Sequence, residues 1–231
     1  MLSIRNLNQF YGQSHILWDL DVDVQEGTCA CLLGRNGVGK TTLLKCITGL
    51  LPVRSGSILF KGSDISRLSP EDRARAGIGY VPQGREIFPL LTVEENLRVS
   101  LGARRDRARQ IPPLIYELFP VLQDMKHRRG GDLSGGQQQQ LAIGRALVLD
   151  PSLLILDEPT EGIQPNIVRD ISDVIRRLNT ELGLTVLLVE QKLPFARRAA
   201  DQFCIMERGR AVADGPMASL DDILIQRYLT V

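Results

Sequence analysis

The strongest constraint on how this chain folds is the segment Gly34–Thr41, which matches the pattern G-x-x-x-x-G-K-[ST]. It follows an apolar run at Thr28–Leu33 that is typical of a buried strand, and it precedes helical spacing at Thr41–Thr48. Glycines at such a turn allow the backbone to curl, so that successive N–H groups point inward. The motif in this setting predicts an α/β core with an anion-binding loop at the carboxyl end of one strand.

Residue types within this loop indicate how it would hold a nucleotide. The backbone N–H groups and the positive end of the following helix favour phosphate oxygens, Lys40 reaches the β- and γ-phosphates, and the Thr41 hydroxyl is a Mg²⁺ ligand. The predicted nucleotide-binding residues of this segment are Gly34, Arg35, Asn36, Gly37, Val38, Gly39, Lys40, Thr41 and Thr42. A chance glycine-rich turn is the alternative, and the strand before the loop and the helix after it argue against that alternative.

Strand and helix patterns alternate over most of the chain. Further strand patterns lie at Leu20–Val24, Ser57–Phe60, Ile78–Val81, Leu153–Leu156, Thr185–Val189 and Phe203–Met206. The alternation predicts a mainly parallel sheet with helices on both faces, and the first sixty residues add antiparallel strands at one edge. Residues 92–149 have mostly helical patterns, with capping boxes at Thr92 and Ser134. We therefore expect one domain over residues 1–231, with a helical subdomain inserted at about 92–149.

Two adjacent carboxylates, Asp157 and Glu158, follow the apolar strand Leu153–Leu156. They lie at the carboxyl end of that strand, where ligands of open α/β sheets bind. Because successive strand residues point in opposite directions, we expect different roles for the two acids. Asp157 suits the Mg²⁺ shell, and Glu158 suits the attacking water, as a general base or as the group that orients it.

Composition limits the partners and the cellular compartments that are expected for this chain. The formal net charge of +1 gives no indication of nucleic acid binding. The four cysteines, Cys29, Cys31, Cys46 and Cys204, lack metal-site spacing and indicate buried, reduced thiols in a cytosolic protein. No signal peptide is expected, and no apolar run approaches the roughly 20 residues that span a bilayer. Any role at a membrane would therefore depend on a partner.

A five-residue motif that precedes the two acids reads Leu133, Ser134, Gly135, Gly136, Gln137. This motif resembles the signature of the ABC ATPases, and the resemblance covers the whole chain. It implies that two such domains face head to tail, with each ATP held between the phosphate loop of one domain and the signature of the other. Ser134 suits this role, because its hydroxyl and the free N–H groups of the helix start can meet a γ-phosphate supplied from outside. Ser134 also caps its own helix.

The same resemblance implies roles for two residues outside these motifs. Tyr11 lies upstream of the phosphate loop, where the family has an aromatic residue that stacks on adenine. Gln83 matches the glutamine that contacts Mg²⁺ and water and senses the membrane partner. ATP and Mg²⁺ are the implied cofactors.

A finer resemblance concerns the type of transporter. Gln83–Pro89 and Leu91–Leu97 look like the ATPases of branched-chain amino acid uptake systems. Glu158–Pro165 and the glutamines Gln137–Gln140 are most similar to the second ATPase subunit of urea or short-chain amide importers. The implied partners are a second ATPase subunit, two membrane permease subunits and, indirectly, a periplasmic solute-binding protein. The implied location is cytoplasmic, as a peripheral protein at the inner face of the cell membrane.

Two departures from the family pattern stand out. A histidine that contacts the γ-phosphate is usual just past the strand after Glu158, and here Gln191 takes that position as a candidate catalytic residue. The alternative is that Gln191 is a tolerated variant that is common in this branch of the family. The usual S-A-L-D becomes Glu161–Gln164, so an aspartate that bridges the two domains is absent. This second departure favours a heterodimer with an ATPase that has different site residues over a symmetric homodimer with two equivalent sites.

Other interpretations share parts of this pattern. An ABC ATPase of an exporter, or of a non-transport process such as DNA repair or translation, would keep the same chemistry. A third alternative is a regulatory module that binds a nucleotide without hydrolysing it. The presence of Lys40, Asp157 and Glu158 argues against this alternative. Basic clusters lie at Arg104–Arg109 and Lys126–Arg129. One interpretation is that they are solvated helix ends and loops; the other is that they contact a partner or lipid headgroups near the membrane.

Overall fold

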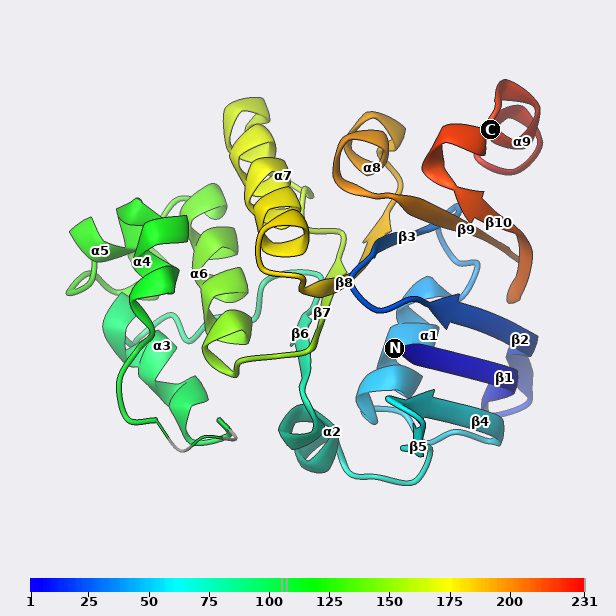
Figure 1. Ribbon diagram of the computed structural model, residues 1–231, viewed down its shortest axis with the longest axis horizontal. Coiled ribbons are helices and arrows are strands. Elements are labelled where there is room, and N and C mark those ends of the chain that lie inside the picture. Colours follow the sequence, from blue (N-terminus) through cyan, green and yellow to red (C-terminus); the bar gives the residue numbers. More distant parts are fainter. Residues whose placement is uncertain (105, 107, 231) are drawn as a thin grey trace.

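The computed structural model describes residues 1–230 except residues 105 and 107, and it contains a parallel sheet with one antiparallel edge strand (Figure 1). In spatial order its strands are β10 (Arg210–Pro216), β9 (Gln202–Glu207), β3 (Cys29–Leu33), β8 (Thr185–Glu190), β7 (Leu153–Asp157) and β6 (Ile78–Val81). All neighbours pair in parallel except β10, which runs antiparallel to β9. The predicted parallel core is confirmed.

The antiparallel strands of the first sixty-four residues form a sheet of their own. In spatial order its strands are β2 (Ser14–Val24), β1 (Leu2–Tyr11), β4 (Ser55–Phe60) and β5 (Ser63–Asp64). Figure 1 shows this sheet beside α1, and its strand β2 contacts β10 of the parallel sheet. The antiparallel character predicted for this region is confirmed, but the antiparallel edge of the parallel sheet itself comes from β10, near the other end of the chain.

Helices fill the connections between the strands. They are α1 (Lys40–Thr48), α2 (Pro70–Ala76), α3 (Val93–Leu101), α4 (Pro113–Leu118), α5 (Pro120–Asp124), α6 (Gly135–Val148), α7 (Pro165–Thr180), α8 (Leu193–Ala199) and α9 (Asp222–Tyr228), with 3₁₀ turns at Gly130–Asp132 and Met217–Ser219. Both predicted capping boxes are present, at the N-terminus of α3 and at that of α6. Between β6 and β7, the described residues of the segment 92–149 belong to helices, turns and loops.

Alternation along the buried strands divides the interior into two cores. In β7, Leu154 and Leu156 pack with the helices α6, α7 and α8, whereas Leu153 and Ile155 pack with α1 and the antiparallel sheet. Successive residues of a strand point to opposite faces, so a strand covered on both faces is apolar throughout. Figure 1 shows α7 and α8 on one side of the sheet and α1 on the other. Helix α1, and with it the phosphate loop, is thereby fixed between two sheets.

Three further predictions concern the cysteines, membrane-spanning helices and one basic cluster. The four cysteines are free thiols, with Cys29, Cys31 and Cys46 buried and Cys204 half-buried. Among the helices that the structure describes, none is long and apolar enough to cross a membrane. In the basic cluster Arg104–Arg109, Arg105 and Arg107 lie outside the described residues, while Arg104 forms an ion pair of 2.7 Å with Asp106.

Candidate active site

The carboxyl ends of three neighbouring strands meet at one edge of the parallel sheet. Strand β8 lies between β3 and β7, with Leu33 paired to Glu190 and Asp157 paired to Val189. Because the three strands run in the same direction, the loops that follow them leave the sheet at the same edge. The phosphate loop, the segment after Asp157 and the segment after Glu190 are therefore neighbours, although more than 150 residues separate the first from the last.

The phosphate loop depends on glycine at its junction with α1. Gly39 is the N-cap of α1 and has a φ of 106°, in the left-handed region that side chains disfavour. A Cβ at this position would lie 2.8 Å from Leu17 Cδ2 of β2. Glycine therefore allows the loop to turn into the helix while the antiparallel sheet packs directly against it, and the free N–H groups of the α1 start face the loop.

Lys40 lies inside the phosphate loop. Its Nζ donates hydrogen bonds to the carbonyl oxygens of Gly34, at 2.7 Å, and of Arg35, at 2.8 Å, and its side chain is 5% exposed. Burial lowers the pKa of this ammonium group, and the nearby carboxylates of Glu158 and Asp157 oppose that shift. The cation is thus held in the concave side of the loop, where the predicted phosphates would bind.

Asp157 is a buried carboxylate with few hydrogen-bond partners. The side chain is 1% exposed; Oδ2 accepts a hydrogen bond of 3.3 Å from Thr41 Oγ1, and Oδ1 has no partner among the described residues. Burial raises the pKa of this carboxyl to about 6, and the neighbouring charge of Glu158 adds to the rise, while the Thr41 hydrogen bond and Lys40 oppose it. A hydroxyl beside a buried carboxylate oxygen without a partner fits Mg²⁺, which takes oxygen ligands and completes its shell with water and phosphate.

Glu158 and Gln191 are brought together from two loops. Glu158 has a φ of 47° at the residue after β7, and Gln191 follows β8 directly. Gln191 Nε2 donates to Glu158 Oε1 at 2.5 Å and to Asn36 Oδ1 at 2.6 Å. One amide therefore joins the phosphate loop, the carboxylate loop and the β8 end, and the structure brings together the two candidate catalytic residues predicted from the sequence.

These residues line an open pocket with a volume of about 570 Å³. Its lining residues are Asn36, Gln83, Glu158, Thr160, Glu161, Gly162, Glu190, Gln191 and Lys192. Gln83 therefore lines the same pocket as Glu158 and Gln191, and its Nε2 donates a hydrogen bond of 2.9 Å to Glu161 Oε2. That partner was not predicted from the sequence.

The five-residue motif lies outside this pocket. Ser134 Oγ accepts a hydrogen bond of 3.4 Å from the Gln137 N–H, and the Gln137 side chain accepts one of 2.9 Å from the Ser134 N–H. Gly136 has no space for a side chain, because a Cβ there would lie 2.8 Å from Ile167 of α7. Figure 1 shows α6 well separated from α1, and Ser134 is exposed. The motif thus presents a helix start to solvent and contributes nothing to the pocket of its own chain.

Tyr11 also lies outside the pocket. It ends β1, pairs with Ser14 across the hairpin and is 47% exposed, so its ring is accessible. His15 of β2 stacks between Phe10, at 4.0 Å between ring centroids, and Trp18, at 3.6 Å. This position confirms that His15 belongs to the first hairpin and not to the β8 end, where Gln191 lies.

The sequence interpretation gave no site role to five lining residues, Thr160, Glu161, Gly162, Glu190 and Lys192. Glu190 is 2% exposed and accepts a hydrogen bond of 2.7 Å from the Thr160 hydroxyl, and Lys192 Nζ donates one of 3.0 Å to the Thr160 carbonyl. A signal for Glu190 was present, because it follows the apolar run Thr185–Val189 as Asp157 follows its own apolar strand.

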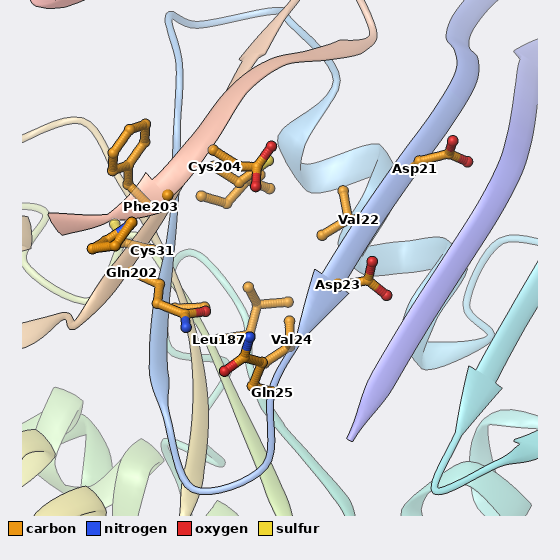
Figure 2. Close-up of a pocket in the computed structure, with 15 residues that line it drawn as sticks. Asp21, Val22, Asp23, Val24, Gln25, Cys31, Leu187, Gln202, Phe203 and Cys204 are labelled. Carbon is orange, nitrogen blue, oxygen red and sulfur yellow. The ribbon is translucent and has the colours of Figure 1, made fainter. Parts of the chain in front are cut away.

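A second cavity of about 380 Å³ lies between the two sheets. Figure 2 shows Asp21, Val22 and Asp23 of β2 on one side of it and Phe203 and Cys204 of β9 on the other. It contains none of the predicted site residues and does not reach the carboxyl ends of β7 or β8. The chemistry is therefore assigned to the pocket at the strand ends.

A family model described as "ABC transporter" matches residues 17–161, which is more than half of the chain. The chain belongs to the ABC transporter family. As a member of this family it is an ATPase, whose hydrolysis of ATP is coupled to transport. The matched segment of this ABC ATPase includes the phosphate loop, the signature and both carboxylates.

Two curated proteins and one solved structure are similar over almost the whole length. The high-affinity branched-chain amino acid transport ATP-binding protein BraG of Pseudomonas aeruginosa is 41% identical, over 95% of this chain and 94% of that protein. The probable branched-chain amino acid transport ATP-binding protein LivF of Archaeoglobus fulgidus is 38% identical, over 93% and 92%. The structure of an ATP-binding subunit of an ABC transporter is 30% identical, with a TM-score of 0.81 over 98% of this chain and 93% of that one.

Proposed function

We propose that this chain powers the import of a small solute by binding and hydrolysing ATP at the carboxyl ends of β3, β7 and β8. The observation that most supports this proposal is the position of Gln191, whose amide links Glu158 to Asn36 of the phosphate loop. A carboxylate held beside a phosphate-binding loop is the arrangement that directed hydrolysis of a phosphate needs.

The phosphate loop binds the nucleotide in this proposal. Lys40 exchanges its hydrogen bonds to the Gly34 and Arg35 carbonyls for bonds to the β- and γ-phosphates, and the N–H groups at the start of α1 donate to phosphate oxygens. Bound Mg²⁺ neutralises charge on these phosphates. Thr41 and Asp157 would hold the metal, and Gln83 would join them after leaving Glu161. The exposed ring of Tyr11 would stack on adenine.

Glu158 and Gln191 act on the water and the γ-phosphate. The Glu158 carboxylate accepts a proton from the attacking water, or orients it, as the oxygen approaches phosphorus. Gln191 holds Glu158 in place with one amide proton, and the other proton, which it donates to Asn36, would pass to a phosphate oxygen when ATP binds. Glutamine does not become cationic, so this position would stabilise the transition state by hydrogen bonding without a titrating charge.

A second ATPase subunit completes each ATP site in this proposal. Within the signature Leu133 to Gln137, Ser134 is exposed at the start of α6, where it would meet the γ-phosphate bound by another chain. The absence of the bridging aspartate at Gln164 favours a second subunit of different sequence. We propose that residues 1–231 form one ABC ATPase domain, with residues 92–149 as its helical subdomain.

Import of urea, short-chain amides or branched-chain amino acids is the finer part of the proposal. The names of BraG and LivF support a branched-chain amino acid system. Local sequence at Glu158–Pro165 and Gln137–Gln140 supports a urea or amide system. In either case the chain would work at the inner face of the cell membrane with two permease subunits, which take solute from a periplasmic binding protein.

Uptake measurements test this proposal. The chain, a second ATPase, two permeases and the solute-binding protein would be expressed together, and uptake of labelled urea, acetamide and leucine would be measured. We expect one of the three to be taken up, with uptake lost in the Glu158→Gln variant and kept in Glu71→Gln, an exposed control on α2. Export of solute from loaded vesicles, or uptake that continues in Glu158→Gln, would contradict the proposal.

A further inference from the structure

Glu190 is a buried acid at the junction of two loops of the active site. It is the last residue of β8 and is 2% exposed, directly before Gln191. A buried carboxylate is retained only where hydrogen bonds compensate for lost hydration. Its partners therefore indicate what it does.

Each oxygen of this carboxylate serves a different loop. Oε1 accepts from Thr160, at 2.7 Å from the hydroxyl and 3.3 Å from the backbone N–H. Oε2 accepts from the backbone N–H groups of Gln191, at 3.1 Å, and Lys192, at 3.3 Å. Thr160 lies two residues after Glu158, so the two oxygens join the Glu158 loop to the Gln191 loop.

The partners require an acceptor at both oxygens. Three of the four hydrogen bonds come from backbone N–H groups, which can only donate. Burial raises the pKa of the Glu190 carboxyl, while the hydrogen bonds from Thr160, Lys192 and Gln191 oppose this rise. Lys192 adds a further link between the loops, because its Nζ donates to the Thr160 carbonyl at 3.0 Å.

We propose that Glu190 is a positioning residue for ATP hydrolysis, which holds the loop of Glu158 and the loop of Gln191 at a fixed separation. The inference rests on the roles proposed above for Glu158 and Gln191. In this proposal Glu190 takes no part in the chemical step. Its carboxylate holds the backbone of the two loops that carry Glu158 and Gln191. A displacement of about 1 Å between catalytic groups can cost about 10²-fold in rate.

Substitution by glutamine tests whether Glu190 acts through its two acceptor oxygens or only through the volume of its side chain. Glutamine has the same shape but one acceptor oxygen, so its NH₂ group must face the donors of one loop. Aspartate keeps the charge but is one methylene shorter, so it cannot reach both loops at once. Thr160→Val removes the hydroxyl donor and leaves both acceptor oxygens in place.

The test is steady-state ATP hydrolysis by the chain assembled with its transporter subunits. We expect Glu190→Gln to lower kcat by about 10- to 100-fold with KM within about threefold of wild type, because the phosphate loop is unchanged. Thr160→Val should lower kcat by less and Thr160→Ser should restore it. Asn179→Ala is the matched structural control: it removes two buried hydrogen bonds, to Gly27 and Leu184, at the other end of the strands. It should lower Tm and leave kcat unchanged.

A double-mutant cycle decides whether Glu190 acts through Gln191. If it does, Gln191→Ala combined with Glu190→Gln should lower kcat little more than the larger single effect. Additive losses, or a kcat for Glu190→Gln equal to that of wild type, would overturn the inference. Glu158→Gln keeps the two failures apart: if that variant retains turnover, the proposed function is wrong, and if it alone is inactive, only the role of Glu190 is wrong.

Discussion

The two halves of the predicted ATP site differ in how far the fold assembles them. At the carboxyl ends of β3, β7 and β8, three loops are joined by hydrogen bonds from Thr41 to Asp157 and from Gln191 to Glu158 and Asn36. At the start of α6, by contrast, the signature serine caps its own helix and stays exposed. The difference indicates that hydrogen bonds within the chain assemble the phosphate and water side of the proposed site, whereas the signature serine stays exposed, as the proposed contact with a second ATPase requires.

The largest effect is expected in the assembled half. Glu158→Gln should lower kcat by about 10² to 10⁴ and leave ATP affinity intact, because the carboxylate acts on the water and does not hold phosphate. The measurement is steady-state ATPase activity of the assembled complex, with ATP binding followed in parallel. A variant that keeps most of its activity would remove Glu158 from this role.

The phosphate loop and the signature should respond differently in the isolated chain. Lys40→Ala should weaken ATP binding and lower hydrolysis by about 10² to 10³, because the cation stabilises both bound phosphates and the charge that develops during transfer. Ser134→Ala should leave the ATP affinity of the isolated chain unchanged and reduce hydrolysis only in the complex. Titration calorimetry on the two variants measures these affinities. Equal losses of ATP affinity would contradict the claim that the phosphate loop, and not the signature, binds ATP in the isolated chain.

The free energy of unfolding should also depend on pH through Asp157, which lies in the assembled half of the site. The pKa of Asp157 is raised to about 6 from 3.8, so the folded chain holds this proton more tightly than the unfolded chain. The contribution of Asp157 to stability is therefore fully present below about pH 4 and is lost as pH rises to about 6. The loss is about 2 to 3 kcal/mol.

Unfolding by denaturant without nucleotide or metal measures this dependence. Between pH 4 and 7, the wild type should lose stability relative to Asp157→Asn, while Ser134→Ala should keep the wild-type dependence. A difference between wild type and Asp157→Asn that stays constant over this range would show that the buried carboxylate does not titrate as described.

The smallest effect is expected at Gln191. Gln191→His should be tolerated but should add a titration near or above pH 6.5, because a phosphate neighbour raises the pKa of histidine. Gln191→Ala should cost more, since Glu158 and the γ-phosphate lose a partner. The pH–rate profiles of the three forms, with the catalytic glutamate of the partner ATPase replaced, provide the measurement. Alanine activity equal to wild type throughout would exclude Gln191 from hydrolysis.

Local patterns predicted most of the parallel core and its motifs. Apolar runs indicated β7 and β8, and Thr92 and Ser134 cap helices as their spacing indicates. The separate antiparallel sheet was not predicted, because the pairing of β1 with β4 depends on contacts across about fifty residues. The edge strand β10 was missed because its half-exposed residues give no apolar run.

The candidate site was predictable in its residue types and not in its pairings. Gly34–Thr41, Asp157 and Glu158 could be read from motifs that each lie within a few positions. Gln83 and Glu161 are 78 positions apart and Gln191 and Asn36 are 155 apart, so their hydrogen bonds follow from how the loops leave the sheet. Glu190 could have been singled out as an acid that ends an apolar strand, but its partners could not.

The central claim is that another chain must complete the ATP site of this one. The most direct test measures ATP turnover per chain for the isolated protein over a range of concentrations, and again after addition of the second ATPase and the permeases. We predict weak turnover by the isolated chain, which rises with protein concentration and rises strongly with the partners, because the phosphate loop alone lacks a signature helix. Full turnover that is independent of concentration in the isolated chain would contradict the claim.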